Sequence, residues 1–133
     1  MKPLFCFALI TLALVTGCKK ETNAPSGPNQ QVLDYGECGG FSGPQWTICF
    51  KSAHEYRCPC MADCVWAGSC NVTLGITGNG TDTLLALCAF PYPGSAPDSA
   101  VINGHTIRLD SLEANMCEHY ADYSFYKVHV SVD

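Results

Sequence analysis

The stretch CNVTLGITGNGTDTLLALCAF, residues 70–90, decides the fold that we expect. Over its first half, apolar side chains occupy every second position: Cys70, Val72, Leu74 and Ile76. Because successive side chains of a strand point to opposite faces, this alternation predicts a half-buried strand. The Gly78-Asn79-Gly80 link accepts the positive φ angles of a tight turn, and residues 81–90 then return as a partner strand. The stretch therefore predicts a β-hairpin.

The same period of two recurs on both sides of this hairpin. It places Trp46, Ile48 and Phe50 on one face of a strand, and it predicts a further strand over residues 126–132. Asn103-Gly104, between two short apolar runs, predicts a second turn. Short strands separated by turn signals are typical of all-β domains, so we expect a small sandwich or barrel-like fold.

Two segments between these strands are expected to form helical turns or loops instead of strands. Asp110 and Glu113 have the spacing of a capping box, so residues 111–119 are expected to form one or two helical turns or a loop. Residues 91–97, PYPGSAP, are expected to form a loop because their three prolines fix φ and remove backbone donors.

The N-terminus reads as an export signal. Lys2 precedes an apolar run over residues 4–15, and the small pair Thr16-Gly17 follows before Cys18. This is the pattern of a signal peptide, here residues 1–17, that is removed on export. The run is too short for a membrane-spanning helix, which needs about 20 residues.

Val15-Thr16-Gly17-Cys18 resembles the lipobox of bacterial lipoproteins. The resemblance implies a diacylglycerol thioether on Cys18 and an acyl group on its new amino terminus, which would make the membrane a partner. Several acyl chains anchor a protein firmly, whereas a single chain binds only marginally. The alternative is an ordinary signal peptide in which Cys18 is incidental.

The residues after Cys18 predict a flexible tether and a location in the cell envelope. Residues 18–31 contain no apolar side chain larger than Ala after the cysteine, so we expect a flexible tether before a domain at 32–133. Lys19 stands where inner-membrane retention signals usually place Asp. This favours an outer-membrane anchor, with the domain on the periplasmic or the cell-surface face.

Charge and cysteine content narrow the class of protein. The chain has 12 acidic and 7 basic side chains, and the basic ones do not cluster, so we expect no nucleic-acid partner. An even number of cysteines in an exported domain of this size is typical of a disulfide framework, here of four bridges, whose pairing the sequence leaves open. The candidates are Cys38, Cys49, Cys58, Cys60, Cys64, Cys70, Cys88 and Cys117.

Residues 55–68, EYRCPCMADCVWAG, resemble a motif of small bacterial envelope proteins: Asp-Ser-Arg-Cys-Pro, four variable residues, then Cys-Val/Ile-Trp-Ala-Gly. The matching positions are Glu55, Arg57, Cys58, Pro59, Cys64, Trp66 and Gly68. Here Glu55 replaces Asp, Tyr56 replaces Ser and Cys60 is an addition, so no role of the motif's serine carries over. Residues 106–109 and 126–130 fit the same family, whose members have no agreed activity.

The resemblance implies a disulfide-closed loop that leads into a strand, with Cys58 bonded to Cys64. Arg57 is then expected to hold a carboxylate, such as that of Glu55, or loop carbonyls, as a structural fork. A ligand-binding role for Arg57 is the alternative. Trp66 is expected to pack in the core at the strand entry.

A metal site is the main chemical alternative to disulfides. Cys58, Cys60, Cys64, Met116, Cys117 and His119 offer soft ligands for copper(I) or zinc. The paired Cys-x-x-Cys spacing of structural zinc sites is missing, and thiols outside the cytoplasm tend to oxidise, so we expect disulfides and no cofactor.

No histidine or serine stands in a recognisable catalytic context such as Gly-x-Ser-x-Gly, so we expect no enzymatic activity. The sequence favours a non-enzymatic binding or structural module, anchored in the envelope, with a protein or glycan partner. A metal-handling lipoprotein is the first alternative. A protease-inhibitor-like domain that uses an exposed loop such as residues 91–97 is the second.

Overall fold

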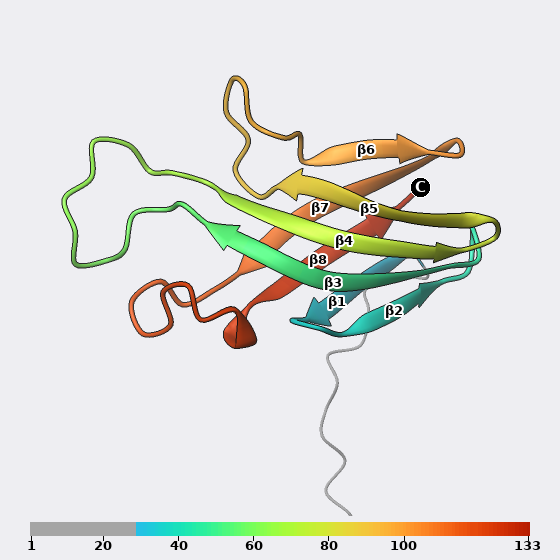
Figure 1. Cartoon of the computed structure of the whole chain (residues 1–133), viewed down its shortest axis with the longest axis horizontal. Coiled ribbons are helices and arrows are strands. Elements are labelled where there is room, and N and C mark those ends of the chain that lie inside the picture. The colour runs from blue at the N-terminus through green and yellow to red at the C-terminus, as the bar shows by residue number, and fades with distance from the viewer. Residues whose placement is uncertain (1–28) are drawn as a thin grey trace, which may run out of the picture.

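The structure, a computed structural model, describes residues 29–133. Within these residues eight strands form two antiparallel sheets that face each other as a sandwich, which confirms the all-β prediction (Figure 1). One sheet has the order β1-β8-β7-β6, and the other has the order β2-β3-β4-β5. The strands are β1 (Gln30–Asp34), β2 (Cys38–Phe41), β3 (Trp46–Glu55), β4 (Cys70–Gly78), β5 (Thr81–Cys88), β6 (Ser99–Ile102), β7 (His105–Glu113) and β8 (Lys127–Val132).

The expected hairpin is strands β4 and β5, and the second expected turn joins β6 and β7. Asn79 and Gly80 have φ angles of 48° and 75°, and Asn103 and Gly104 have 48° and 83°. Two successive positive φ angles define the type I′ turn, whose twist matches that of the strands it connects. Both turn predictions are confirmed.

The core lies between the two sheets. The alternation seen in the sequence puts one face of each long strand into it, and its fully buried members include Ile48, Phe50, Val72, Leu74, Ile76, Ile107, Val128 and Val130. Thr47 and Lys51, on the opposite face of β3, are exposed. The predicted faces of β3, β4 and β8 are therefore confirmed.

Strand β7 overturns the expected helical turns at 111–113. It continues to Glu113, and Leu112 is buried opposite Val128 of β8. The core contact of Leu112 outweighs the local capping pattern, because burial of a leucine stabilises by more than a cap does. Within residues 29–133 the one helical element is a 3₁₀ turn, η1 (Tyr123–Phe125), and no helix there is long and apolar enough to cross a membrane.

Strands β1 and β2 had no counterpart in the expected elements. Strand β1 begins at Gln30, two positions before the expected domain start at residue 32, and pairs with β8. The expected signal peptide, Cys18 and the tether up to residue 28 lie outside the described residues.

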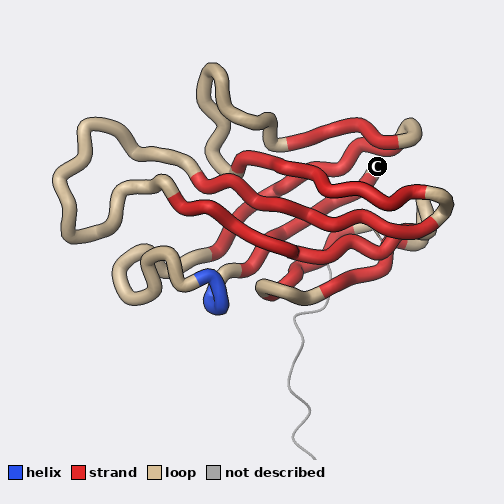
Figure 2. Tube along the Cα trace, viewed as in Figure 1, coloured by secondary structure: helices blue, strands red, loops and turns tan. Residues whose placement is uncertain are grey.

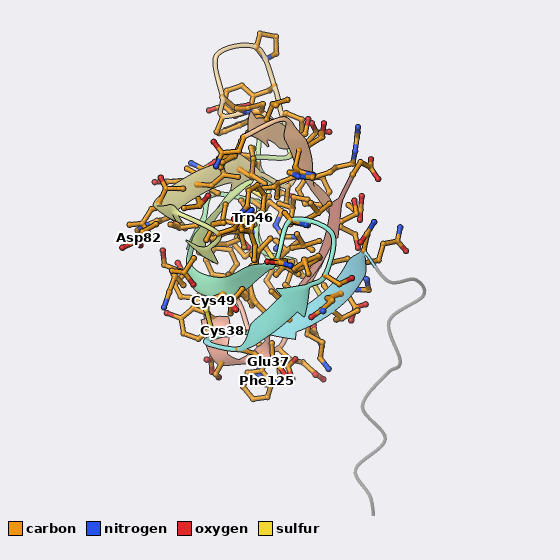
Figure 3. The ribbon with its side chains drawn as sticks, turned by 90° about the vertical axis from the view of Figure 1, so that its right-hand side faces the viewer. Glu37, Cys38, Trp46, Cys49, Asp82 and Phe125 are labelled. Atoms are coloured by element: carbon orange, nitrogen blue, oxygen red, sulfur yellow. A yellow bond between two sulfur atoms is a disulfide. The ribbon has the colours of Figure 1, made fainter. Side chains whose placement is uncertain are left out.

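Three disulfides cross-link the described residues. Cys38–Cys49 joins β2 to β3, where Figure 3 shows the two residues side by side. Cys58–Cys64 closes a short loop, as the motif resemblance implied. Cys60–Cys117 spans 57 positions of sequence.

The expectation of four bridges is wrong in this structure, because Cys70 and Cys88 carry free, buried thiols. The β4–β5 register sets Asn71 opposite Cys88, one residue out of step with Cys70. Adjacent positions of a strand direct their side chains to opposite faces, so the two thiols leave the sheet in directions that do not favour a bond. Burial raises the pKa of the Cys70 thiol to about 12.

Three long loops gather toward one end of the sandwich: residues 56–69, 89–98 and 114–126 (Figure 2). We call these three segments the loop end. Strand β8 begins at Lys127 beside it and runs to the opposite end, where Ser131 pairs with Gln30. The first described strand therefore starts at the end of the sandwich that is remote from the loops.

Candidate functional site

The loop end is organised around the carboxylate of Glu55, the last residue of β3. Arg57 donates to its Oε1 from the backbone nitrogen at 2.9 Å and from Nε at 2.8 Å. Nη2 of Arg57 and the hydroxyl of Tyr126 donate to Oε2, the latter at 2.7 Å. The Glu55 side chain is fully buried, so its charge is stable there only because these donors surround it.

The charges of this fork shift the pKa values of its members. Burial alone would raise the pKa of Glu55, but the hydrogen bonds from Arg57 and Tyr126 outweigh it and hold that pKa below its ordinary range. Burial and the bond to the Glu55 carboxylate raise the pKa of Tyr126. Arg57 also lies over the ring of Phe90, 5.3 Å from its centre. The structural-fork interpretation of Arg57 is what the contacts show.

Loop 56–69 folds back on itself beyond the fork. The backbone of Tyr56 donates to the carbonyl of Ser69 at 2.8 Å, and that of Cys58 donates to Ala67 at 3.1 Å. Gly68 has a φ of 75°, and a Cβ there would collide with the Tyr56 carbonyl. The glycine of the motif is therefore required by the close approach of the two arms.

Two disulfides staple this loop. Cys58–Cys64 closes its tip, and Cys60–Cys117 ties it to loop 114–126. Because the bonds act on different parts of the loop, the tip is fixed both internally and against the neighbouring loop. The stapled loop is thus a preformed surface.

Large apolar side chains are exposed on the stapled loop and on the neighbouring loop 89–98. Met61 is 97 % exposed and Val65 is 103 % exposed. Tyr56, Trp66, Phe90 and Tyr92 are each about half exposed, and the rings of Trp66 and Tyr92 meet edge to face at 5.6 Å. We call these six residues the apolar cluster. Several large apolar side chains exposed at one end of a domain are typical of an interaction site.

The position of Trp66 corrects a sequence expectation. It was expected in the core, but it is 54 % exposed and packs against Tyr92 of the neighbouring loop. The reason is that residues 56–69 form a stapled loop outside the sandwich, so the tryptophan precedes β4 without reaching the core.

The proposed metal ligands do not form a thiolate set. All four candidate cysteines, Cys58, Cys60, Cys64 and Cys117, are bonded in disulfides. His119 stacks on the ring of Phe125 at 3.6 Å, and the sulfur of Met116 lies against the Tyr126 hydroxyl. Within residues 29–133 no group of three or more His, Cys, Asp or Glu residues is arranged to hold a metal ion.

No family model, curated protein or solved structure matches this chain. The chemistry of the loop end must therefore indicate what it binds. Sequence reasoning found the Glu55–Arg57 fork and the Cys58–Cys64 loop through the motif, but it missed the exposure of Met61, Val65 and Trp66. Their signal was weak, because large apolar residues in a Cys- and Pro-rich segment without periodicity fit a buried loop equally well.

Proposed function

We propose that this chain is an envelope-anchored lipoprotein whose loop end binds another protein, without catalysing a reaction. The apolar cluster, four of whose members lie on the stapled loop and two on loop 89–98, is the observation that carries the proposal. Protein interfaces are enriched in Tyr, Trp, Phe, Met and Arg, the residue types gathered here. A surface that disulfides hold in place loses less conformational entropy on binding, which favours affinity.

The apolar cluster favours a protein over a glycan as the partner. Met61 and Val65 are its most exposed members, and neither offers a hydrogen-bonding group to a sugar hydroxyl. Burial of both side chains against an apolar protein surface would stabilise the complex, since the hydrophobic effect scales with the apolar area removed from water.

The anchor completes this proposal. Lipid on Cys18 would hold the domain at the outer membrane, as the lipobox and Lys19 suggest, and the resemblance to a motif of small envelope proteins supports the same location. Gln30, through which the chain leads back to Cys18, lies at the end remote from the loops. A domain tethered there would present its apolar cluster away from its own anchor.

Site-specific photo-crosslinking in cells tests the binding surface. A photoreactive residue is placed at Val65, and in a matched control at Val101, which is also exposed but lies on β6. We expect the Val65 probe, and not the Val101 probe, to yield a discrete protein adduct. Trp66→Ala in the same chain should abolish the adduct. Identical adducts from both probes, or none from Val65, would overturn the proposal.

The anchor is tested separately by cell fractionation. Wild-type chain should partition with the membranes, and its N-terminal peptide should begin at Cys18 with the mass of the lipid. Cys18→Ser should release the domain to the soluble fraction. A soluble wild-type chain would contradict the anchor and leave the crosslinking result standing, so the two parts of the proposal fail independently.

A further inference from the structure

Strand β5 is the least protected edge of the sandwich. The edge strands of the described residues are β1, β2, β5 and β6. Strands β2 and β6 have four residues and β1 has five, whereas β5 has eight. Exposed edges pair readily with other strands unless Lys, Pro or short length prevents it, and β5 contains no Lys, Arg or Pro.

The register of β4 and β5 shows which backbone groups of β5 face outward. Gly78 and Thr81 close the tight turn, and the backbone of Ala89 donates to Cys70 at 2.9 Å. Antiparallel residues alternate between bonded and non-bonded pairs, so the odd-numbered residues of β5 bond to β4. The even-numbered residues Asp82, Leu84 and Ala86 therefore direct their N–H and C=O groups away from the sheet.

Strand β5 has a free segment with defined ends. The backbone of Cys88, next in the outward series, donates to Pro97 at 2.8 Å, which occupies the edge there. At the other end the chain turns back through Gly80. Within residues 29–133 no backbone hydrogen bond engages the outward groups of Asp82, Leu84 or Ala86. The open segment is thus centred on Leu84.

We infer that β5 pairs antiparallel with β5 of a second copy of this chain, about a two-fold axis at Leu84. The arrangement sets Leu84 opposite its own counterpart and Asp82 opposite Ala86, and each pair exchanges both backbone hydrogen bonds. Because the outward groups are distributed symmetrically about Leu84, a second copy satisfies all of them. Two four-stranded sheets become one continuous sheet.

Side chains and charges agree with this pairing. Leu84 is 69 % exposed on the outer face, and the two-fold axis brings it against its counterpart, which buries both. Asp82, which Figure 3 shows at the outer margin, faces Ala86 rather than another carboxylate. The turn at Asn79 carries the second chain toward its own β4 at the point where Pro97 closes the edge.

Light scattering after size-exclusion chromatography of the purified full chain tests the pairing, at about 100 μM, where a dimer of micromolar or tighter Kd is almost fully populated. Wild type should have the mass of a dimer. Leu84→Lys should shift it to a monomer, because two ammonium groups would meet at the axis. Val101→Lys, at a β6 position with the same 69 % exposure, should remain dimeric.

A second pair of variants tests the same contact by a positive signal, which a variant that merely unfolds would not give. Leu84→Cys should form a disulfide-linked dimer under mild oxidation, because opposite residues of a bonded pair are about 5.5 Å apart, within disulfide range. Val101→Cys should not. A monomeric wild type, an unchanged dimer in Leu84→Lys, or equal crosslinking of both cysteine variants would overturn the inference.

Discussion

The hydroxyl of Tyr126 donates a 2.7 Å hydrogen bond to the carboxylate of Glu55, 71 positions earlier in the chain. This contact joins the residue before β8 to the last residue of β3, and so it links the two sheets at the loop end. Arg57 holds the same carboxylate from the other side. The base of the stapled loop is therefore fixed by a buried charge that both sheets share.

Glu55→Gln should destabilise the domain by about 2 kcal/mol, because it removes the charge from several hydrogen bonds and leaves the Arg57 cation without its counter-ion. The measurement is the urea midpoint at neutral pH, with the slope of the transition unchanged. Asp63→Asn, at an exposed carboxylate of the same loop, should change the stability by less than about 0.5 kcal/mol. Equal midpoints for the two variants would show that the fork does not stabilise the fold.

Stability should depend on acid through the same residue. The pKa of Glu55 is lowered in the folded state, so its contribution is complete above its unfolded pKa of about 4.3 and is lost as the pH falls through the folded value. Urea midpoints measured between about pH 3 and pH 7 should fall toward acid in wild type, and this fall should be smaller in Glu55→Gln. Parallel curves would contradict the assignment.

The raised pKa of Tyr126 predicts a loss of stability at alkaline pH. Its contribution is present below the unfolded pKa of about 10 and is lost as the pH rises through the folded value. Tyr126→Phe removes the titrating hydroxyl while keeping the buried ring. Between about pH 9 and pH 11 the urea midpoint of wild type should therefore decline more steeply than that of Tyr126→Phe. A variant that declines as steeply as wild type would assign the alkaline loss to other groups.

The two staples of the loop should differ in their contribution to stability. Chain-entropy estimates give about 4 kcal/mol for a closed loop of the Cys60–Cys117 size and about 2 kcal/mol for one of the Cys58–Cys64 size. Replacing Cys60 and Cys117 by Ser should lower the urea midpoint more than replacing Cys58 and Cys64. The reverse order would mean that loop 114–126 does not depend on its covalent tie.

The parts of this fold that could be predicted are the local ones. Alternation and turn chemistry predict β3, β4, β5 and β8 because each signal lies within a few neighbouring residues. Strand β2 was not predicted because Gly39 and Gly40 have no side chains that could alternate. Strand β1 was not predicted because Gln30 and Gln31 are both polar. Strand β1 forms by pairing with β8, and β2 forms by pairing with β3. A local sequence pattern carries no information about these partners.

In the candidate site, too, the local features could be predicted from the sequence and the long-range contacts could not. The motif located the fork and its closed loop, since Glu55, Arg57 and Cys58 are close in sequence. The exposure of Trp66 and the part played by Tyr126 depend on contacts between distant segments, the Cys60–Cys117 bond above all. Sequence periodicity carries no information about such contacts.

The two free cysteines of residues 29–133, Cys70 and Cys88, give the sharpest test of the disulfide pattern. Cys70 and Cys88 are fully buried thiols, and Cys70 is further protected by its raised pKa of about 12, so neither should react with an alkylating reagent in the native state. In denaturant without reductant, intact mass should show the alkylation of both, and full reduction should then release the six bonded cysteines. Alanine at both positions should leave the three bridges intact. If no cysteine reacts in denaturant, Cys70 and Cys88 form a fourth bridge, and the β4–β5 register at Asn71 must shift by one residue to bring their side chains to the same face.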